Sequence, residues 1–334
     1  MKLFFLISIL FSLNCFSADK LKSYHIDTTQ ITISGVSSGA FMAQQMSVAY
    51  SKTFSGIASI AGGIFWCSQG SSQRAQTECM KQTESLVPQF FIEKARELEA
   101  KGEIDPLENM RRQKVYLFAS PKDSVIKPPS SDRLYEFLTA FTPAENITYE
   151  KTQAFAHGFP TVDFGALCNI GYIPWLLKCN FDTAGEILKT LHPSIKVAPP
   201  VSAKAADDKN LLVFDQSEFG NEQTPLYSTG WVYVPEKCAA GEKCSLHVAL
   251  HGCQMTPDFI QDQFAKHAGF NVWAENNNMI VLYPQSAKLG SANPYACWDW
   301  YGFSGEHYMT QLGPQMKALK LMIDRLSSAV AVSK

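Results

Sequence analysis

The sequence predicts an α/β fold with a mostly parallel central sheet flanked by helices. Two observations predict it. Short apolar segments alternate with helix-forming segments through the first half of the chain, as in βαβ units. One of them, residues 30–34, continues directly into Gly35-Val36-Ser37-Ser38-Gly39, and a helix-forming run follows. The chain has 334 residues, 46% of them hydrophobic, so it can bury one large core, and we expect a single domain over residues 19–334.

The expected strands are short apolar runs bounded by turn residues or by a helix. They lie at residues 30–34, 54–61, 115–119, 147–151, 211–214, 230–234, 246–250 and 279–283. The first four alternate with helices, which favours parallel pairing. Residues 211–214 and 230–234 instead follow each other without a helix and are typical of an antiparallel pair.

The expected helices lie at residues 41–50, 84–101, 133–141, 264–276 and 307–328. Residues 161–209 differ from the rest of the chain, because they combine two cysteines, several prolines and mixed polarity. We expect this stretch to be an excursion over the sheet, as a lid or insertion. No internal repeat or low-complexity linker divides the chain.

The N-terminus is typical of a secretory signal peptide over residues 1–18. Lys2 supplies the positive end, residues 3–13 an apolar core, and Ser17-Ala18 the small residues for cleavage. A buried N-terminal strand is the alternative. No segment predicts a membrane span, and a net charge of -2 offers no basic surface to nucleic acid. We therefore expect a secreted protein, extracellular or periplasmic, without a nucleic-acid or membrane partner.

Eight cysteines remain once Cys15 leaves with the signal peptide, and an even set in a secreted chain indicates disulfides. Many connectivities are open. Short sequence gaps favour Cys67–Cys79, Cys168–Cys179 and Cys238–Cys244, which leaves Cys253–Cys297. A zinc site is the alternative, but no Cys-x-x-Cys or His-x-x-x-His spacing supports it, so we expect no metal.

Ser37 is the candidate nucleophile. A strand followed by Gly-x-Ser-x-Gly and a helix is the sequence form of the nucleophile elbow, where a serine occupies a strained turn. Gly35 and Gly39 lack the side chains that would prevent this turn from closing. Ester hydrolysis by a serine also requires a base, an acid that orients the base, and donors for the oxyanion.

Asp123 and His157 are the candidate acid and base. Asp123 follows strand 115–119 and His157 follows strand 147–151, so both are expected at the same edge of the sheet as Ser37. The rivals, none of which directly follows a clear strand in the right order, are Asp105 and Asp163 for the acid and His192 and His307 for the base. A turn aspartate and a loop histidine without catalytic roles are the plain alternatives.

Two backbone amides are expected to form the oxyanion hole. One belongs to Ser38, and the other to Cys253 in the loop that follows strand 246–250. His251 is more typical of a residue that fixes this loop than of a base. A Cys253–Cys297 disulfide would hold the loop in place.

The segment from Cys297 to Gly302 is dense in aromatic residues. Trp298, Trp300 and Tyr301 offer flat, amphipathic surface, and a disulfide from Cys297 would place them beside the oxyanion loop. We expect them to line a cleft for an apolar, ester-rich substrate. Ordinary core packing is the alternative for each of them.

The order of these elements departs from that of the usual α/β-hydrolase chain. There the first hairpin and the oxyanion-loop strand precede the nucleophile, whereas here they follow it. Circular permutation, with the break before the nucleophile strand, is the simplest explanation. It predicts that the mature N-terminal segment and the 307–328 helix are neighbours.

Three segments together resemble poly(3-hydroxybutyrate) depolymerases of the single-domain, circularly permuted α/β-hydrolase type: residues 35–40, 250–253 and 297–301. The resemblance covers nearly the whole mature chain. It implies a secreted serine esterase with the triad Ser37, Asp123 and His157, a polyester or oligoester substrate that Trp298 and Trp300 contact, and no cofactor. The alternatives are another secreted carboxylesterase, of feruloyl or acetyl-xylan type, and a non-catalytic binder on a hydrolase scaffold.

Overall fold

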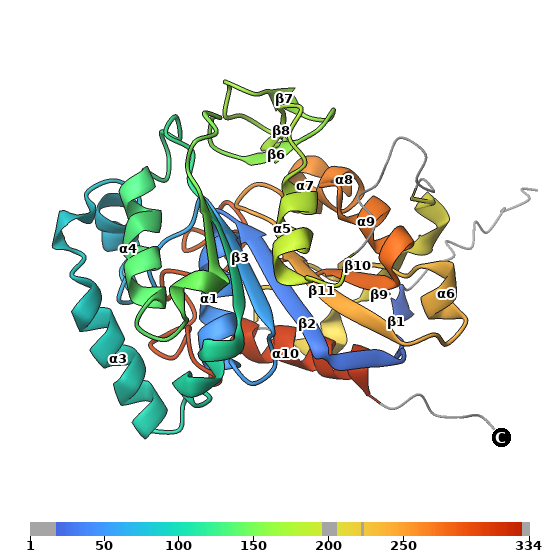
Figure 1. Cartoon of the computed structure of the whole chain (residues 1–334), viewed down its shortest axis with the longest axis horizontal. Coiled ribbons are helices and arrows are strands. Elements are labelled where there is room, and N and C mark those ends of the chain that lie inside the picture. The colour runs from blue at the N-terminus through green and yellow to red at the C-terminus, as the bar shows by residue number, and fades with distance from the viewer. Residues whose placement is uncertain (1–17, 196–205, 222–223, 329–334) are drawn as a thin grey trace, which may run out of the picture.

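The computed structural model describes residues 18–195, 206–221 and 224–328 (Figure 1). The predicted signal peptide lies outside these residues except for Ala18. Within them the main element is a nine-stranded sheet with the order β1-β9-β10-β12-β11-β2-β3-β4-β5. Its strands are β1 (Asp19–Lys20), β2 (Ile26–Val36), β3 (Gly56–Ile60), β4 (Lys114–Phe118), β5 (Ile147–Glu150), β9 (Leu211–Asp215), β10 (Thr229–Tyr233), β11 (Cys244–Leu250) and β12 (Met279–Tyr283).

Pairing in this sheet is mostly parallel. All neighbours from β12 through β11, β2, β3 and β4 to β5 run in parallel. Strand β10 runs antiparallel to both of its neighbours, β9 and β12. The α/β class and the antiparallel pair predicted from the sequence are therefore confirmed.

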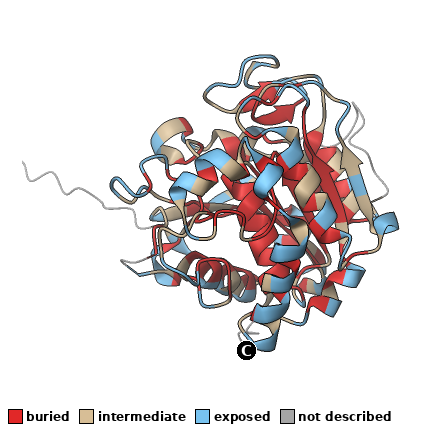
Figure 2. Ribbon diagram, turned by 90° about the vertical axis from the view of Figure 1, so that its left-hand side faces the viewer, coloured by how far each residue is buried: buried red, intermediate tan, exposed pale blue. Residues whose placement is uncertain are grey.

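Two layers of helices cover the sheet, and each layer has its own apolar core. The first core contains side chains of α1 (Ser38–Ala49), α3 (Pro88–Ala100), α4 (Pro128–Leu138) and α10 (Pro314–Ser327), and the second contains those of α5 (Thr183–Leu191), α8 (Gln263–His267) and α9 (Phe270–Asn277). Neighbouring strand residues alternate between the cores: in β3, Ile57 belongs to the first and Ala58 to the second. Figure 2 shows the buried residues concentrated in the centre of the molecule. Three short helices, α2 (Ser72–Arg74), α6 (Glu236–Ala239) and α7 (Pro257–Ile260), lie in connections.

Several helices begin or break at positions that the apolar pattern did not indicate. Helices α3, α4 and α10 each start at a proline, because proline fits the first helical position, where its missing N–H costs nothing. Residues 307–313 are consequently a loop. The helix predicted over residues 264–276 is instead two helices, α8 and α9, since Gly269 between them has φ of 94°.

The predicted excursion over residues 161–209 has two parts. Strands β6 (Phe159–Thr161), β7 (Ala166–Leu167) and β8 (Leu176–Lys178) form a small separate sheet, seen at the top of Figure 1. Helix α5, in contrast, is a core helix, whose Ile187 and Leu188 are fully buried against the main sheet. Residues 196–205 lie outside the described part of the chain.

The N-terminal segment and α10 are neighbours, as circular permutation predicts. The Tyr24 amide donates a hydrogen bond of 2.8 Å to the Leu326 carbonyl. The Arg325 guanidinium donates to the Leu21 carbonyl at 3.3 Å. The segment that leads into β2 is thus fastened to the last helix of the described chain.

Candidate active site

Ser37 occupies a strained turn between β2 and α1. Its φ of 56° and ψ of -121° belong to a conformation that non-glycine residues rarely adopt. The Ser37 amide donates to the Ile60 carbonyl at 2.9 Å, which ties the turn to β3. A Cβ atom on Gly35 would lie 2.1 Å from the Gly39 carbonyl oxygen, so the turn closes only with glycine there. The strained strand-to-helix turn expected from the sequence is present, and it carries the candidate nucleophile Ser37.

The structure brings Ser37, Asp123 and His157 together. The His157 ring places Nδ1 2.7 Å from Asp123 Oδ2 and Nε2 3.1 Å from Ser37 Oγ. The second carboxylate oxygen, Asp123 Oδ1, accepts hydrogen bonds from the amides of Val125 at 2.8 Å and Ile126 at 2.9 Å. Because a carboxylate can only accept, Nδ1 carries the proton, and Nε2 faces Ser37 as an acceptor.

The loop that carries His157 is braced on two sides. Buried Ser120 Oγ accepts from the Phe155 amide at 2.7 Å and donates to the Phe155 carbonyl at 2.5 Å, which links the Asp123 turn to the His157 loop. On the other side, the Trp175 ring lies edge-on to the His157 ring, 5.9 Å between centroids. The small sheet of the excursion thus supports the candidate base.

Three of the four rival residues make other contacts, and the fourth, Asp163, is exposed. His192 hydrogen-bonds Thr32 Oγ1 at 2.7 Å, and burial lowers the pKa of His192 to about 4. His307 pairs with Glu103 at 3.1 Å. The Asp105 carboxylate accepts from the side-chain amide of Gln311 at 2.9 Å.

Helix α1 packs directly on the loop that follows β11. A Cβ atom on Gly39 would lie 2.4 Å from the His251 carbonyl oxygen and 2.5 Å from that of Leu250. In the same loop, the Gly252 amide donates to Met255 Sδ at 3.2 Å, whereas the Cys253 amide has no hydrogen-bond partner within the described residues. The Ser38 amide belongs to the first turn of α1, where backbone donors have no intrahelical acceptor. Both amides expected in the oxyanion hole are therefore donors without a partner in the part of the chain that the structure describes.

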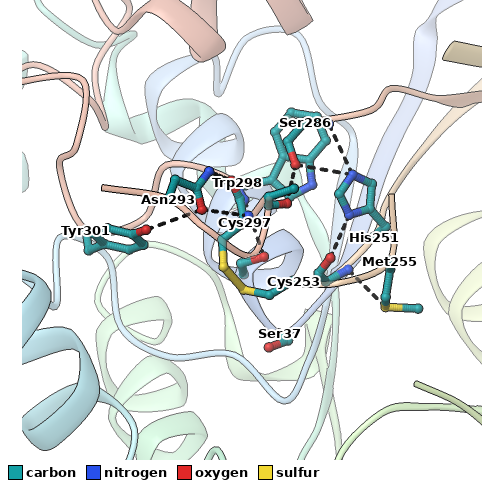
Figure 3. Close-up of a disulfide and its surroundings, with 12 residues drawn as sticks. Ser37, His251, Cys253, Met255, Ser286, Asn293, Cys297, Trp298 and Tyr301 are labelled. Atoms are coloured by element: carbon teal, nitrogen blue, oxygen red, sulfur yellow. Dashed lines mark hydrogen bonds between the residues drawn. A yellow bond between two sulfur atoms is a disulfide. The ribbon is translucent and has the colours of Figure 1, made fainter. Parts of the chain in front are cut away.

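Four disulfides join the cysteines of the described chain, and their pairs are the ones that the sequence gaps favoured: Cys67–Cys79, Cys168–Cys179, Cys238–Cys244 and Cys253–Cys297. The last one joins the oxyanion loop to the aromatic segment, as Figure 3 shows. Asn293 holds the backbone of Cys297 in place, because its side chain accepts a hydrogen bond from the Cys297 amide at 2.9 Å and donates one to the Cys297 carbonyl at 2.8 Å.

The three aromatic residues of this segment differ in their surroundings. Trp300 and Tyr301 line a cleft of about 450 Å³ that also contains Ser37 and His157. Trp300 stacks on Phe41 with ring centroids 4.3 Å apart. Trp298 does not line this cleft: it is 0% exposed, and its ring packs against His251, 5.2 Å between centroids. The expectation that Trp298 contacts substrate is thus corrected, because its side chain points into the core behind the oxyanion loop.

Sequence reasoning missed much of the cleft wall. Val125 and Ile126 line the cleft and follow closely after Asp123 in the sequence. Their closeness to the candidate acid was the signal that could have identified them. Trp175 and Tyr295 come from irregular loops without any local signal. Among its described residues, the wall contains no aspartate, glutamate, lysine or arginine, and its one histidine is His157. The site is therefore a largely apolar cleft that contains the candidate nucleophile Ser37.

The described part of the chain also lacks two features that would point to other functions. It holds no group of three or more histidine, cysteine or acidic side chains placed to bind a metal ion. None of its helices is both long and apolar enough to traverse a lipid bilayer.

Comparison with known sequences gives consistent matches. The family model for esterase PHB depolymerase matches residues 229–320. The poly(3-hydroxybutyrate) depolymerase of Delftia acidovorans is 39% identical over 315 residues, 93% of this chain, and the chain spans 62% of that relative's length. The polyhydroxybutyrate depolymerase of Talaromyces funiculosus is 32% identical over 329 residues, which cover 93% of this chain and 94% of the relative.

Solved structures match over a similar extent. The crystal structure of PHB depolymerase from Penicillium funiculosum superposes with a TM-score of 0.84 at 30% identity, over 92% of this chain and 99% of that one. A serine-to-alanine variant of PHB depolymerase in complex with an R3HB trimer matches with the same TM-score, 0.84. Identity, coverage and fold agree, and this chain belongs to the poly(3-hydroxybutyrate) depolymerase family of esterases.

Proposed function

We propose that this chain is a secreted serine esterase that hydrolyses ester bonds of poly(3-hydroxybutyrate), related short-chain polyesters or their oligomers. The observation that carries the proposal is the hydrogen-bonded series Asp123–His157–Ser37 at the wall of an apolar cleft. The names of the relatives support the substrate class, since one solved relative holds an R3HB trimer.

The reaction proceeds through an acyl-enzyme. His157 Nε2 takes the Ser37 proton as Oγ attacks the ester carbonyl, while Asp123 holds the imidazole and offsets its charge. The amides of Ser38 and Cys253 stabilise the oxyanion. The alcohol end of the polyester leaves with the proton from His157. Water, activated by the same histidine, then releases the acid end and restores Ser37.

The cleft suits a neutral, apolar chain. Its described wall carries no lysine, arginine, aspartate or glutamate, and it includes Phe41, Met80, Trp175 and Trp300. An aliphatic polyester presents methyl groups and ester carbonyls but no charge. When it binds to such a wall and excludes water, no charged group has to be desolvated. Feruloyl and acetyl-xylan esters remain the alternative within the same chemistry.

The disulfides support export of the protein. Four of them join the described residues, and disulfides persist in the extracellular space and the bacterial periplasm. We propose that residues 1–18 are removed on export and that residues 19–334 form the catalytic domain.

The test compares wild type with Ser37→Ala on a suspension of poly(3-hydroxybutyrate) granules and on p-nitrophenyl butyrate. We expect wild type to clear the granules and to cleave the short ester, and Ser37→Ala to do neither. Cleavage of the short ester without clearing would move the substrate to oligomers or plant esters. A folded wild type that cleaves neither and does not react with a fluorophosphonate probe would instead be a non-catalytic binder.

A further inference from the structure

We propose that His251 is a positioning residue of the oxyanion hole, which fixes the Gly252–Cys253 peptide so that the Cys253 amide points at the oxyanion. The inference rests on the proposed function, because it concerns the same site. It assigns to His251 a defined effect on the reaction without contact with the substrate.

One peptide plane links His251 to the Cys253 amide. His251 Nδ1 lies 2.7 Å from the Gly252 carbonyl oxygen. The Gly252–Cys253 bond is trans, so the Gly252 carbonyl and the Cys253 N–H point in opposite directions. A hydrogen bond that holds the carbonyl therefore also sets the direction of the amide. Cys253 lines the cleft and His251 does not, so the amide points from the His251 side toward the cleft.

The protonation of His251 follows from its second contact. The Ser286 amide donates to Nε2 at 3.2 Å, so Nε2 is an acceptor and the single proton resides on Nδ1. Burial lowers the pKa of His251 to about 4, which keeps the ring neutral near pH 7. The tautomer with Nδ1–H is the one that donates to the Gly252 carbonyl.

A closed ring of bonds holds this arrangement, as Figure 3 shows. Ser286 Oγ donates to the Ala296 carbonyl at 2.5 Å, the next residue is Cys297, and its disulfide returns to Cys253. Tilting the peptide of Cys253 would break a link of this ring.

Two neighbouring side chains complete the arrangement. Met255 Sδ accepts a hydrogen bond from the Gly252 amide at 3.2 Å, so of these two amides only that of Cys253 lacks a partner among the described residues. The buried ring of Trp298 packs against the His251 ring, with centroids 5.2 Å apart. Trp298, whose expected contact with substrate the structure does not show, thus limits the rotation of His251.

A matched pair of variants separates positioning from stability. In His251→Asn, the side-chain amide occupies the place of Nδ1–H and can still donate to Gly252, but it does not reach Ser286. In His251→Gln, the longer side chain brings its carbonyl oxygen to the Ser286 amide, and its NH2 group then lies away from the place of Nδ1, so the Gly252 carbonyl loses its donor. Both variants lose one of the two contacts and leave Ser37, His157 and Asp123 unchanged.

The readouts are kcat and KM on p-nitrophenyl butyrate and the inhibition constant of phenylboronic acid, whose serine adduct mimics the oxyanion. We expect His251→Gln to lose about ten- to a hundredfold in kcat with KM within about twofold, less than the loss of a whole oxyanion donor. Its inhibition constant rises in parallel. His251→Asn stays within about threefold of wild type, although both variants unfold at lower temperature.

Two results would overturn the inference. One is an equal loss of kcat in both variants, or none in His251→Gln. The other concerns wild type and does not require that the variants fold: ¹⁵N imidazole shifts that place the proton on Nε2 of His251. An inactive wild type, unlabelled by a fluorophosphonate, would reject the proposed function instead, which is a separate outcome.

Discussion

Gly39 is a position where a single added methyl group should disturb the site. It lies in the first turn of α1, against the backbone of the loop that follows β11. In Gly39→Ala the new Cβ would lie 2.4 Å from the His251 carbonyl oxygen, about 1 Å short of the 3.4 Å at which ordinary contact begins. Backbone atoms cannot rotate out of the way, so α1 and the loop must separate.

The separation acts on both stability and catalysis. Overpacking of this size costs about 1–3 kcal/mol of unfolding free energy. It also moves the Ser38 amide relative to the Cys253 amide, and a misplacement of about 1 Å can reduce the rate by about a hundredfold. We therefore expect kcat on p-nitrophenyl butyrate to fall by about a hundredfold. The assay temperature must lie well below the unfolding temperature of the variant, so that the loss is not caused by unfolding.

Gly102→Ala is the matched control. Gly102 has φ of 67° with no atom within 4 Å of an added Cβ, so alanine there costs about 1 kcal/mol of backbone strain and nothing at the site. Urea unfolding and steady-state kinetics are measured for both variants. A Gly39→Ala enzyme that is destabilised yet keeps full kcat would refute the link between this contact and the oxyanion hole.

The geometry of the site also sets the expected effects of three other changes. Asp123→Asn should keep the fold and lower kcat by about ten-thousandfold, because an amide does not stabilise the Nδ1–H tautomer and the charge of His157; steady-state kinetics and circular dichroism check this. Reduction of the Cys253–Cys297 disulfide should abolish esterase activity. Since the bridge spans 44 residues, its loss should also lower the unfolding free energy by about 4 kcal/mol. Titration with dithiothreitol, in parallel with the Cys253→Ser/Cys297→Ser double variant, tests both effects. Burial lowers the pKa of His192 and of His251 to about 4, so the unfolded chain binds more protons between about pH 6.5 and 4; the unfolding free energy should fall by up to about 1.4 kcal/mol per pH unit for each as pH decreases through that window, and a flat urea midpoint between pH 7 and 5 would contradict this.

The sequence indicated the triad because its constraints are local or topological. The turn at Ser37 closes only with glycine at position 35, and Asp123 and His157 follow strands that end at the same edge of a parallel sheet. Helix limits were harder to predict from apolar spacing, since a proline at the first position, as in α10, decides where a helix begins. The cleft wall required contacts between loops that no spacing encodes.

The segment after Cys297 shows why the aromatic residues could not be assigned from sequence. Trp298 and Trp300 are two positions apart, but the chain there is irregular, so no period predicts their directions. Asp299, between them, makes a buried turn: its carboxylate accepts from the amides of Gly302 at 2.8 Å, Phe303 at 3.0 Å and Ser304 at 2.9 Å.

Distant residues then fix the position of this turn. The Asp299 amide donates to Gln315 Oε1 at 2.7 Å, and its carbonyl accepts from Gln45 Nε2 at 3.0 Å. Burial raises the pKa of Asp299, and hydrogen bonds from the Ser304 hydroxyl and the three amides offset only part of this rise by favouring the ionised form. Asp299 therefore helps to determine where the aromatic side chains on either side of it lie. It bends the chain, and in the bent segment Trp298 lies in the core behind His251 whereas Trp300 lies at the cleft.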